Sequence, residues 1–256
     1  ALATEHQAVN LGQGFPDFGC DPALIDAVSD AMREGLNQYP SMLGVLELRQ
    51  AIAQKVQTLY QKSYDPATEI TVTAGATQAI INAILAVVRA GDEVIVLEPC
   101  YDSYIPNIEL AGGTVVRVPL TPGSFRPDFD RISAAITPRT RAMLINSPHN
   151  PTGRVFTREE VQLVADLAIE HDLLVVTDEV YEHLVFDGFE FFTIAQVEPR
   201  LYERTLTMNG ASKAYAMTGW RIGYAGGPQW LIKAMGDLQS QSTSNPCSIS
   251  QYAVTA

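Results

Sequence analysis

Short apolar runs rich in β-branched residues alternate with segments of helical period from Glu69 to Gln239, and no other feature constrains the fold of this chain as strongly. Each run has the length of one strand, and the intervening segments carry apolar residues three or four positions apart. This alternation is typical of an α/β domain in which helices cover both faces of a mostly parallel sheet, a three-layer α/β/α arrangement. We predict strands at Ile70 to Thr73, Glu93 to Leu97, Thr114 to Val118, Ala142 to Ile145, Leu173 to Thr177, Thr205 to Met208 and Trp220 to Ala225. We predict helices at Thr77 to Val88, Asp128 to Ile136, Arg158 to Glu170 and Pro228 to Gln239.

The segments on either side of this region carry fewer strand signals. Residues 1 to 20 are expected to form an extended arm whose glycines let the backbone approach a ligand. Asp21 and Pro22 carry the signals of a helix start, and residues 45 to 60 predict a second amphipathic helix. The final SISQYAVTA has the pattern of a helix start without a terminating glycine, asparagine or proline, so we expect a further C-terminal part.

Charge and cysteine content restrict the class of partner. The 256 residues carry a formal net charge of −12, which argues against nucleic acid and anionic membrane surfaces, since both attract basic patches. Cys20, Cys100 and Cys247 are odd in number and lack CxxC spacing, so we expect neither a disulfide framework nor a metal site. That pattern fits a reducing cytoplasm, and apolar runs such as Leu173 to Val176 are too short to span a bilayer. A small molecule is the expected partner.

One lysine stands out by its surroundings. Lys55 and Lys62 lie in a polar amphipathic stretch, and Lys233 is expected on the outer face of a helix. Lys213 instead has small and partly apolar neighbours, with Arg221 close behind it. A nearby cation and partial desolvation lower the pKa of a lysine and make it a nucleophile. Lys213 is therefore the candidate for covalent chemistry, although an isolated lysine is more often a solvated surface residue.

Ligands of open α/β sheets bind beyond the carboxyl ends of the strands, so the residues that follow each predicted strand are candidates. Gly75, Ala76 and Thr77 follow the first strand and lead directly into a helix. Small residues, the free amides of a helix start and the threonine hydroxyl together predict a phosphate cup. The alternative is a glycine turn in which Thr77 is an ordinary helix cap.

Aromatic side chains follow the predicted strand from Glu93 to Leu97, and amide side chains follow the one from Ala142 to Ile145. Tyr101 and Tyr104 are placed to stack on a flat ligand ring, although half-buried packing is the commoner role. Asn150 lies in a turn that its neighbouring prolines and Gly153 make rigid, which indicates a fixed side-chain donor. His149 is either an acid or base, or a structural residue.

Asp178 follows a buried apolar strand, with Glu179, Val180 and Tyr181 behind it. A carboxylate in such a place is costly unless a cation or strong donors meet it, and no arginine or lysine is adjacent in sequence. The protonated ring nitrogen of a ligand would satisfy Asp178. The alternatives are a helix cap or an ion pair with a distant arginine.

Taken together, these groups match pyridoxal 5′-phosphate, whose pyridine nitrogen requires an acidic partner and whose aldehyde requires a lysine. Over essentially its whole length, the sequence resembles the class I/II aminotransferases of pyridoxal-phosphate fold type I. The resemblance rests on the segments LGQGFPDF, AGATQA, NSPHNPTG, TDEVY and SKAYAMTGWRIGY. The front half is especially similar to methionine and kynurenine aminotransferases, and the last segment also to prokaryotic aspartate aminotransferases.

The resemblance implies a role for each candidate residue. Lys213 would carry the cofactor covalently and move a proton between the substrate α-carbon and the cofactor, while Asp178 would pair with the pyridinium nitrogen. The other implied roles are ring stacking by Tyr101, hydrogen bonds to the phenolic oxygen from Asn150 and Tyr181, phosphate binding by Gly75, Ala76, Thr77 and Arg221, substrate binding by Gly14 and Asn150, and contact with the neighbouring subunit's cofactor by Tyr39. That last contact implies a homodimer with shared active sites.

The chain departs from the family pattern in two places. Many relatives have a phosphate-binding serine three positions before the lysine, where this chain has Gly210, with Ser212 nearer to Lys213. The arginine that binds the substrate carboxylate lies in the family's C-terminal small domain, which this sequence does not reach. We therefore expect residues 1–38 to form the arm and part of the small domain, and residues 39–256 the large cofactor domain. A protein ending at Ala256 is expected to bind the cofactor without efficient transamination.

The leading functional prediction is an amino-acid:2-oxo-acid aminotransferase with methionine, glutamine or an aromatic amino acid as donor. The alternatives are an aspartate-type aminotransferase, a carbon–sulfur β-lyase that uses the same cofactor, and a non-catalytic sensor fused to a DNA-binding module. A nicotinamide enzyme is disfavoured, because no GxGxxG segment follows the first strand.

Overall fold

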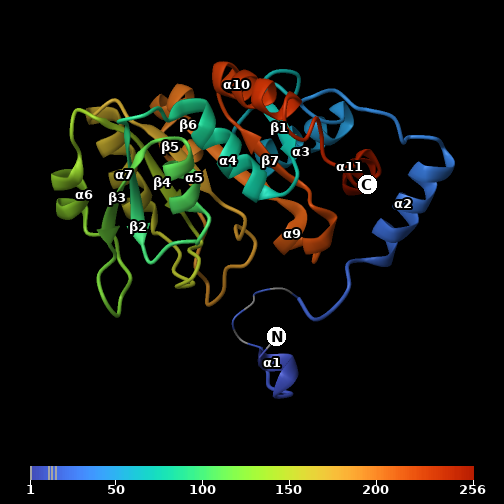
Figure 1. Ribbon diagram of the computed structural model, residues 1–256, viewed down its shortest axis with the longest axis horizontal. Coiled ribbons are helices and arrows are strands. Elements are labelled where there is room, and N and C mark those ends of the chain that lie inside the picture. The colour runs from blue at the N-terminus through green and yellow to red at the C-terminus, as the bar shows by residue number, and fades with distance from the viewer. Residues whose placement is uncertain (1, 11, 13, 15) are drawn as a thin grey trace.

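Seven strands form one sheet in the order β1-β7-β6-β5-β4-β2-β3 (Figure 1). The structure, a computed structural model, describes residues 2–10, 12, 14 and 16–256. Strand β7 runs antiparallel to β1 and β6, and the other neighbouring strands are parallel. The prediction of a mostly parallel sheet is confirmed. The strands are β1 (Ile70–Thr73), β2 (Glu93–Glu98), β3 (Thr114–Pro119), β4 (Thr140–Asn146), β5 (Leu174–Asp178), β6 (Thr205–Gly210) and β7 (Gly223–Gly226).

The start of β7 departs from the prediction of a strand from Trp220. Residues Thr218–Trp220 form a short 3-10 helix, η2, and Arg221 follows it with a φ of 57°, in the left-handed region. Because a left-handed residue cannot continue an extended strand, pairing with β6 begins only at Gly223.

Local capping signals mark the starts of several helices. Asp21 caps α2 by accepting a hydrogen bond from the amide of Ala23. Thr157 and Glu160 form a capping box at the start of α7. The predicted helices are confirmed, with small shifts at their ends. The helices are α1 (Leu2–Glu5), α2 (Pro22–Arg33), α3 (Leu46–Tyr60), α4 (Ala76–Val87), α5 (Tyr104–Leu110), α6 (Phe129–Ala135), α7 (Arg158–Glu170), α8 (Ile194–Val197), α9 (Ala211–Ala214), α10 (Gln229–Ser240) and α11 (Ser248–Thr255), with the 3-10 helices η1 (Pro199–Arg204) and η2.

Local structure differs from the prediction at the N-terminal arm and after β2. The arm is not extended throughout, because it begins with the short helix α1, which lies apart from the rest of the chain in Figure 1. Leu11, Gln13 and Phe15 of the LGQGFPDF segment lie outside the described residues. Helix α5, like the short helices α8 and α9, was not predicted.

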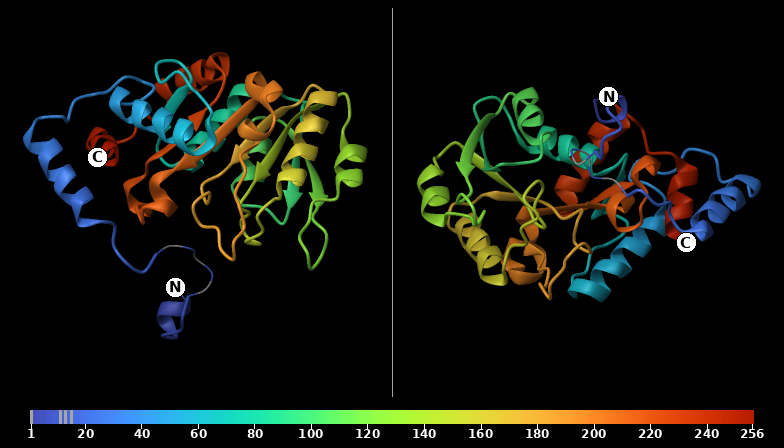
Figure 2. Two further views of the ribbon diagram at one scale, coloured as in Figure 1. Left: turned by 180° about the vertical axis from the view of Figure 1, so that it is seen from behind. Right: turned by 90° about the horizontal axis from the view of Figure 1, so that it is seen from below.

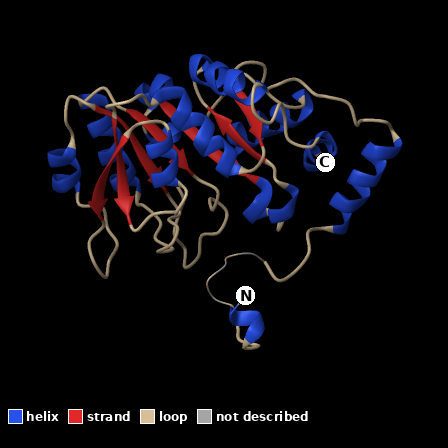
Figure 3. Ribbon diagram, viewed as in Figure 1, coloured by secondary structure: helices blue, strands red, loops and turns tan. Residues whose placement is uncertain are grey.

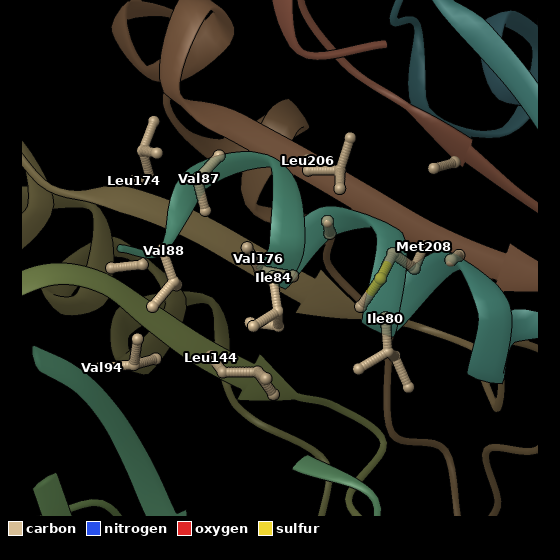
Figure 4. Close-up of a cluster of buried hydrophobic side chains, with 14 of the residues drawn as sticks. Ile80, Ile84, Val87, Val88, Val94, Leu144, Leu174, Val176, Leu206 and Met208 are labelled. Atoms are coloured by element: carbon tan, nitrogen blue, oxygen red, sulfur yellow. The ribbon is translucent and has the colours of Figure 1, made fainter. Parts of the chain in front are cut away.

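Helices lie against both faces of the sheet (Figure 2), and apolar clusters hold them there. Successive strand residues point to opposite faces. Val96 of β2 therefore packs with α4, α5 and α10, whereas Ile95 packs with α6, α7 and α8. Figure 4 shows the first cluster, with Ile84 of α4 lying over Val176 of β5. The predicted three-layer α/β/α arrangement is confirmed.

Helix α3 packs on β1 and β7, where Leu48 and Ile52 join a third apolar cluster. Lys55, which the sequence places in a polar amphipathic stretch, lies on this helix and forms a partly buried ion pair with Glu182. The prediction for Lys233 is confirmed, since it lies exposed on α10 in an ion pair with Asp237.

The parallel strands β6, β5, β4 and β2 are neighbours, so their carboxyl ends lie at the same edge of the sheet (Figure 3). The loops that leave this edge carry most of the candidate residues. Among the described residues, no helix is both long and apolar enough to cross a membrane.

Candidate active site

A cavity of about 870 Å³ opens at the carboxyl edge of the sheet. Strand-end loops, the start of α4, helix α9 and the N-terminal arm all contribute to its wall. It brings together nine of the predicted site residues, namely Gly14, Ala76, Thr77, Tyr101, Asn150, Asp178, Tyr181, Lys213 and Arg221. Gly75 lies directly behind Arg221 rather than on the wall, and Tyr39 lies away from the cavity with 89% of its surface exposed.

Lys213 lies on α9, immediately after β6, and its Nζ reaches the cavity half-buried. The ammonium donates a hydrogen bond of 2.9 Å to the carbonyl oxygen of Gly14 and lies 5.8 Å from the centre of the Tyr181 ring. Burial lowers the pKa of Lys213, and the positive charge of Arg221 lowers it further. Both causes favour the neutral, nucleophilic amine.

Asp178 ends β5 with its carboxylate buried beside the cavity. Its Oδ2 accepts a hydrogen bond of 2.9 Å from the Tyr104 hydroxyl, and its Oδ1 accepts one of 3.3 Å from the amide of Val180. Burial raises the pKa of Asp178, and these two hydrogen bonds oppose the rise. Within the described part of the chain, no arginine or lysine forms an ion pair with Asp178, so the alternative of a distant arginine partner is not supported.

The start of α4 and the Arg221 guanidinium form a cup for an anion. Gly75 precedes α4 with a φ of +78°, and a Cβ built on it would lie 2.3 Å from Nη2 of Arg221. The guanidinium therefore occupies the space that a side chain at position 75 would fill. The first amides of α4, at Ala76 and Thr77, have no intrahelical acceptor, so they are free to bind an anion beside the Thr77 hydroxyl.

Gly210 and Ser212 show how the loop before Lys213 differs from the family pattern. A Cβ at position 210 would lie 3.0 Å from the carbonyl oxygen of Ile222, so a serine there would crowd the neighbouring strand. Ser212 is buried and lines the cavity, so it is the serine of this loop that can reach a bound anion.

Tyr101 and Tyr104 have different roles in this structure. Tyr101 lines the cavity, where its ring face can lie against a flat ligand. Tyr104 is only 2% exposed, and its ring meets that of Tyr101 edge to face at 5.6 Å between centroids. Tyr104 therefore supports Tyr101 from behind while its hydroxyl holds Asp178.

The loop after β4 is held by Asn146. Its Oδ1 accepts a hydrogen bond of 2.6 Å from the amide of Asn150, and its Nδ2 donates one of 2.8 Å to the carbonyl of Asp178. One side chain thus joins the ends of β4 and β5. His149 is buried, its Nδ1 lies 2.8 Å from the Thr152 hydroxyl, and burial lowers its pKa to about 4, which indicates a neutral structural histidine.

The sequence interpretation missed the supporting roles of Tyr104, Asn146 and Ser212. The strand-end rule points to Asn146, because it is the last residue of β4. Nothing in the sequence marks Tyr104 as a partner of Asp178, because the two residues are far apart along the chain. They come close only because β5, which ends in Asp178, pairs with β4 in the folded sheet.

The donor set fits pyridoxal 5′-phosphate at each of its functional groups. The α4 amides, Thr77 and Arg221 suit a dianionic phosphate, which needs several donors and a positive charge. The buried Asp178 carboxylate, which lacks a cationic partner among the residues described, suits a protonated ring nitrogen. Lys213 is the lysine on the cavity wall, and its amine suits the aldehyde.

A mostly parallel sheet with a lysine, a buried carboxylate and an anion cup at its carboxyl edge defines the class of α/β proteins that hold a phosphorylated aromatic cofactor. Comparison with protein families matches residues 6–256 to the family described as aminotransferase class I and II. The chain belongs to this family, whose members depend on pyridoxal 5′-phosphate.

Named relatives and solved structures agree with this assignment. The aspartate/prephenate aminotransferase of Cereibacter sphaeroides is 47% identical over 253 residues, which cover 98% of this chain and 63% of the relative. The probable N-succinyldiaminopimelate aminotransferase of Mycobacterium tuberculosis is 49% identical over 234 residues, covering 91% of this chain and 59% of the relative. An Escherichia coli structure with an identified methionine aminotransferase function superposes with a TM-score of 0.96 at 40% identity, covering 99% of this chain and 67% of that one.

These matches also set the extent of the similarity. The chain spans 63% and 59% of the lengths of the two curated relatives. What those longer proteins act on is a property of each relative, and its extension to this chain is a proposal.

Proposed function

We propose that the protein is a pyridoxal-phosphate-dependent amino-acid:2-oxo-acid aminotransferase that works by two half-reactions in ping-pong order. The observation that supports this most directly is that Lys213, Asp178 and Arg221 line one cavity at the carboxyl edge of the sheet. The family assignment supports the same reaction class.

When bound, pyridoxal 5′-phosphate supplies an electron sink that weakens the bonds at the substrate's α-carbon. The amine of Lys213 would attach covalently to the cofactor. The same amine would then move the proton of the substrate's α-carbon. Because burial and Arg221 lower the pKa of its amine, Nζ can accept the α-proton and return it to an adjacent carbon. Tyr181, beside Nζ, and Asn150 orient the ring through its phenolic oxygen.

Asp178 would pair with the protonated ring nitrogen of the cofactor and so keep the ring able to withdraw electrons. Its carboxylate is 5% exposed on the cavity wall and has no cationic partner among the described residues, so a protonated ring nitrogen would suit it. Arg221, Thr77 and Ser212 would hold the phosphate from the wall of the same cavity.

Methionine, glutamine or an aromatic amino acid is the proposed donor. The E. coli structure with a methionine aminotransferase function and the aromatic-amino-acid aminotransferase 2 of Thermococcus litoralis support this choice. Aspartate is the second candidate, supported by the aspartate/prephenate relatives. Gly14, whose carbonyl meets Lys213, would lie near the substrate carboxylate.

An amino-donor screen tests the proposal. Purified protein loaded with pyridoxal 5′-phosphate is mixed with each donor in turn, and the change in cofactor absorption is followed together with formation of the matching 2-oxo acid. Conversion of the donor to its 2-oxo acid supports the aminotransferase. Ammonia and pyruvate released together from a cystathionine-like substrate would instead identify the β-lyase.

A cytoplasmic homodimer is part of the same proposal. Tyr39 is 89% exposed and does not line the cavity of its own chain, which supports a contact with a second copy. Sedimentation of wild-type and Tyr39→Ala protein, with cofactor affinity measured on both, tests this. A dimer whose Tyr39→Ala variant binds the cofactor more weakly supports the shared site.

A further inference from the structure

The turn formed by residues 178–182 is a wall between two cavities. Asp178, Val180 and Tyr181 face the candidate cofactor cavity. Glu179 and Glu182 face a second cavity of about 20 Å³, which lies on the other side of the turn against α3, β6 and β7. The groups proposed to meet the cofactor and the two glutamates therefore alternate along one short segment.

Glu182 is held by two side chains of helix α3. Its carboxylate is 5% exposed and accepts hydrogen bonds from Nζ of Lys55 and from the Tyr60 hydroxyl. Lys55 also donates a bond of 3.0 Å to the Tyr224 hydroxyl of β7. Burial alone would lower the pKa of Lys55, but Tyr224 and Glu182 raise it well above its ordinary value, so this amine is charged and structural.

The backbone of the turn has few anchors of its own. Beyond Asp178, the amide of Glu179 bonds the carbonyl of Met208 at 2.9 Å, and the next backbone bonds are local to the turn, such as Glu182 to Glu179 at 2.9 Å. Glu179 is further fixed by the hydroxyls of Thr177 and Thr193, at 3.1 and 2.8 Å. The far end of the turn, next to Tyr181, thus depends on the Glu182 side chain and its partners on α3.

We propose that Lys55 and Glu182 are positioning residues that hold the turn from behind and so keep Tyr181 and Asp178 aligned on the cofactor. The proposal rests on the proposed function, because it assumes that the cavity in front of the turn binds pyridoxal 5′-phosphate. The Lys55–Glu182 ion pair is buried, and neither residue lines the candidate cofactor cavity. Such a pair adds little net stability compared with apolar residues of similar size, so its value lies in fixing a geometry.

Replacing both members of the pair separates positioning from stability. Lys55→Met leaves the buried Glu182 carboxylate without its lysine partner, with only the Tyr60 hydroxyl and the nearby His183 ring beside it, which lowers the melting temperature of the apoprotein and also loosens the turn. Lys55→Met/Glu182→Met removes the buried charge and should regain most of the melting temperature. The anchor of the turn is still absent, so the dissociation constant for pyridoxal 5′-phosphate should stay raised by about tenfold.

The measurement is a titration of each apoprotein with pyridoxal 5′-phosphate, followed by quenching of tryptophan fluorescence, beside a thermal melt. Lys233→Met is the matched control, because it breaks an exposed lysine–aspartate pair far from the turn and should change neither value. A double variant that binds the cofactor within twofold of the wild type overturns the proposal. If wild-type protein fails to bind the cofactor, it is the proposed function that fails.

Discussion

The Tyr104 hydroxyl donates a hydrogen bond of 2.9 Å to Oδ2 of Asp178, and both side chains are buried. This bond connects α5 to the end of β5, so the carboxylate proposed to meet the ring nitrogen has a fixed orientation before any ligand arrives. The same tyrosine packs edge to face against Tyr101. One buried residue thus supports both the stacking ring and the carboxylate.

Replacing Tyr104 by phenylalanine tests the importance of that bond. The hydroxyl stabilises the charged form of Asp178, so its loss should raise the pKa of this carboxyl further and weaken its pairing with the ring nitrogen. We expect kcat/KM for the preferred donor to fall about tenfold. Tyr101→Phe keeps its stacking ring and should remain close to the wild type, whereas unchanged kinetics in Tyr104→Phe would refute the role given to this hydroxyl.

Replacing Gly75 by alanine should disrupt the phosphate cup. The new Cβ would meet Nη2 of Arg221 at 2.3 Å, so the guanidinium must leave its place. We expect affinity for pyridoxal 5′-phosphate to fall about tenfold or more, while affinity for pyridoxal, which lacks the phosphate, changes little. The readout is the pair of dissociation constants.

Gly123→Ala is the matched control for the backbone. Gly123 also has a positive φ, +83°, but no atom lies within 4 Å of its added Cβ. The variant should carry the strain of a positive φ without the clash at Arg221, and it should bind both ligands normally. Equal weakening of pyridoxal and its phosphate in Gly75→Ala would show that the damage is not confined to the phosphate cup.

The buried Glu179 should make the stability of the apoprotein depend on pH. Burial, followed by the charge of Glu182, raises the pKa of Glu179 from 4.5 to about 8, against the hydrogen bonds from Thr193 and Thr177. Between these two pH values the folded state retains a proton that the unfolded state has lost. The free energy of unfolding should therefore fall as pH rises from about 4.5 to about 8.

Denaturant unfolding of wild-type and Glu179→Gln apoprotein across this window tests the assignment. The variant should lose less stability as pH rises, because glutamine does not titrate. His149, whose pKa is lowered to about 4, contributes in the opposite direction in both proteins and cancels in the comparison. Parallel pH profiles for the two proteins would exclude a raised pKa at Glu179.

Residues that follow strands were predictable, and residues that act through distant partners were not. Thr77, Asp178 and Lys213 each follow an apolar run, and the parallel arrangement of the sheet brings such positions to one edge. The polar pattern around Lys55, by contrast, is that of an ordinary solvated helix face. Its burial arises because Glu182, from the turn after β5, meets α3 there.

Two roles of Arg221 were predicted: as a cation near Lys213 that lowers the pKa of that lysine, and, from the family resemblance, as a phosphate ligand. In the structure burial is the larger cause and Arg221 the smaller one, while its guanidinium packs on Gly75 at the anion cup. The left-handed backbone at Arg221, with a φ of 57°, had no signal in the sequence.

The central claim is that Lys213 carries the cofactor. Wild-type protein, Lys213→Ala and the control Lys233→Ala are each loaded with pyridoxal 5′-phosphate, reduced with borohydride, digested and mapped by mass spectrometry. We expect a phosphopyridoxyl group on the peptide that contains Lys213 in the wild type and in Lys233→Ala, and we expect Lys213→Ala to lose both this label and turnover. A stoichiometric label on another lysine, or full turnover in Lys213→Ala, would show that Lys213 does not carry the cofactor.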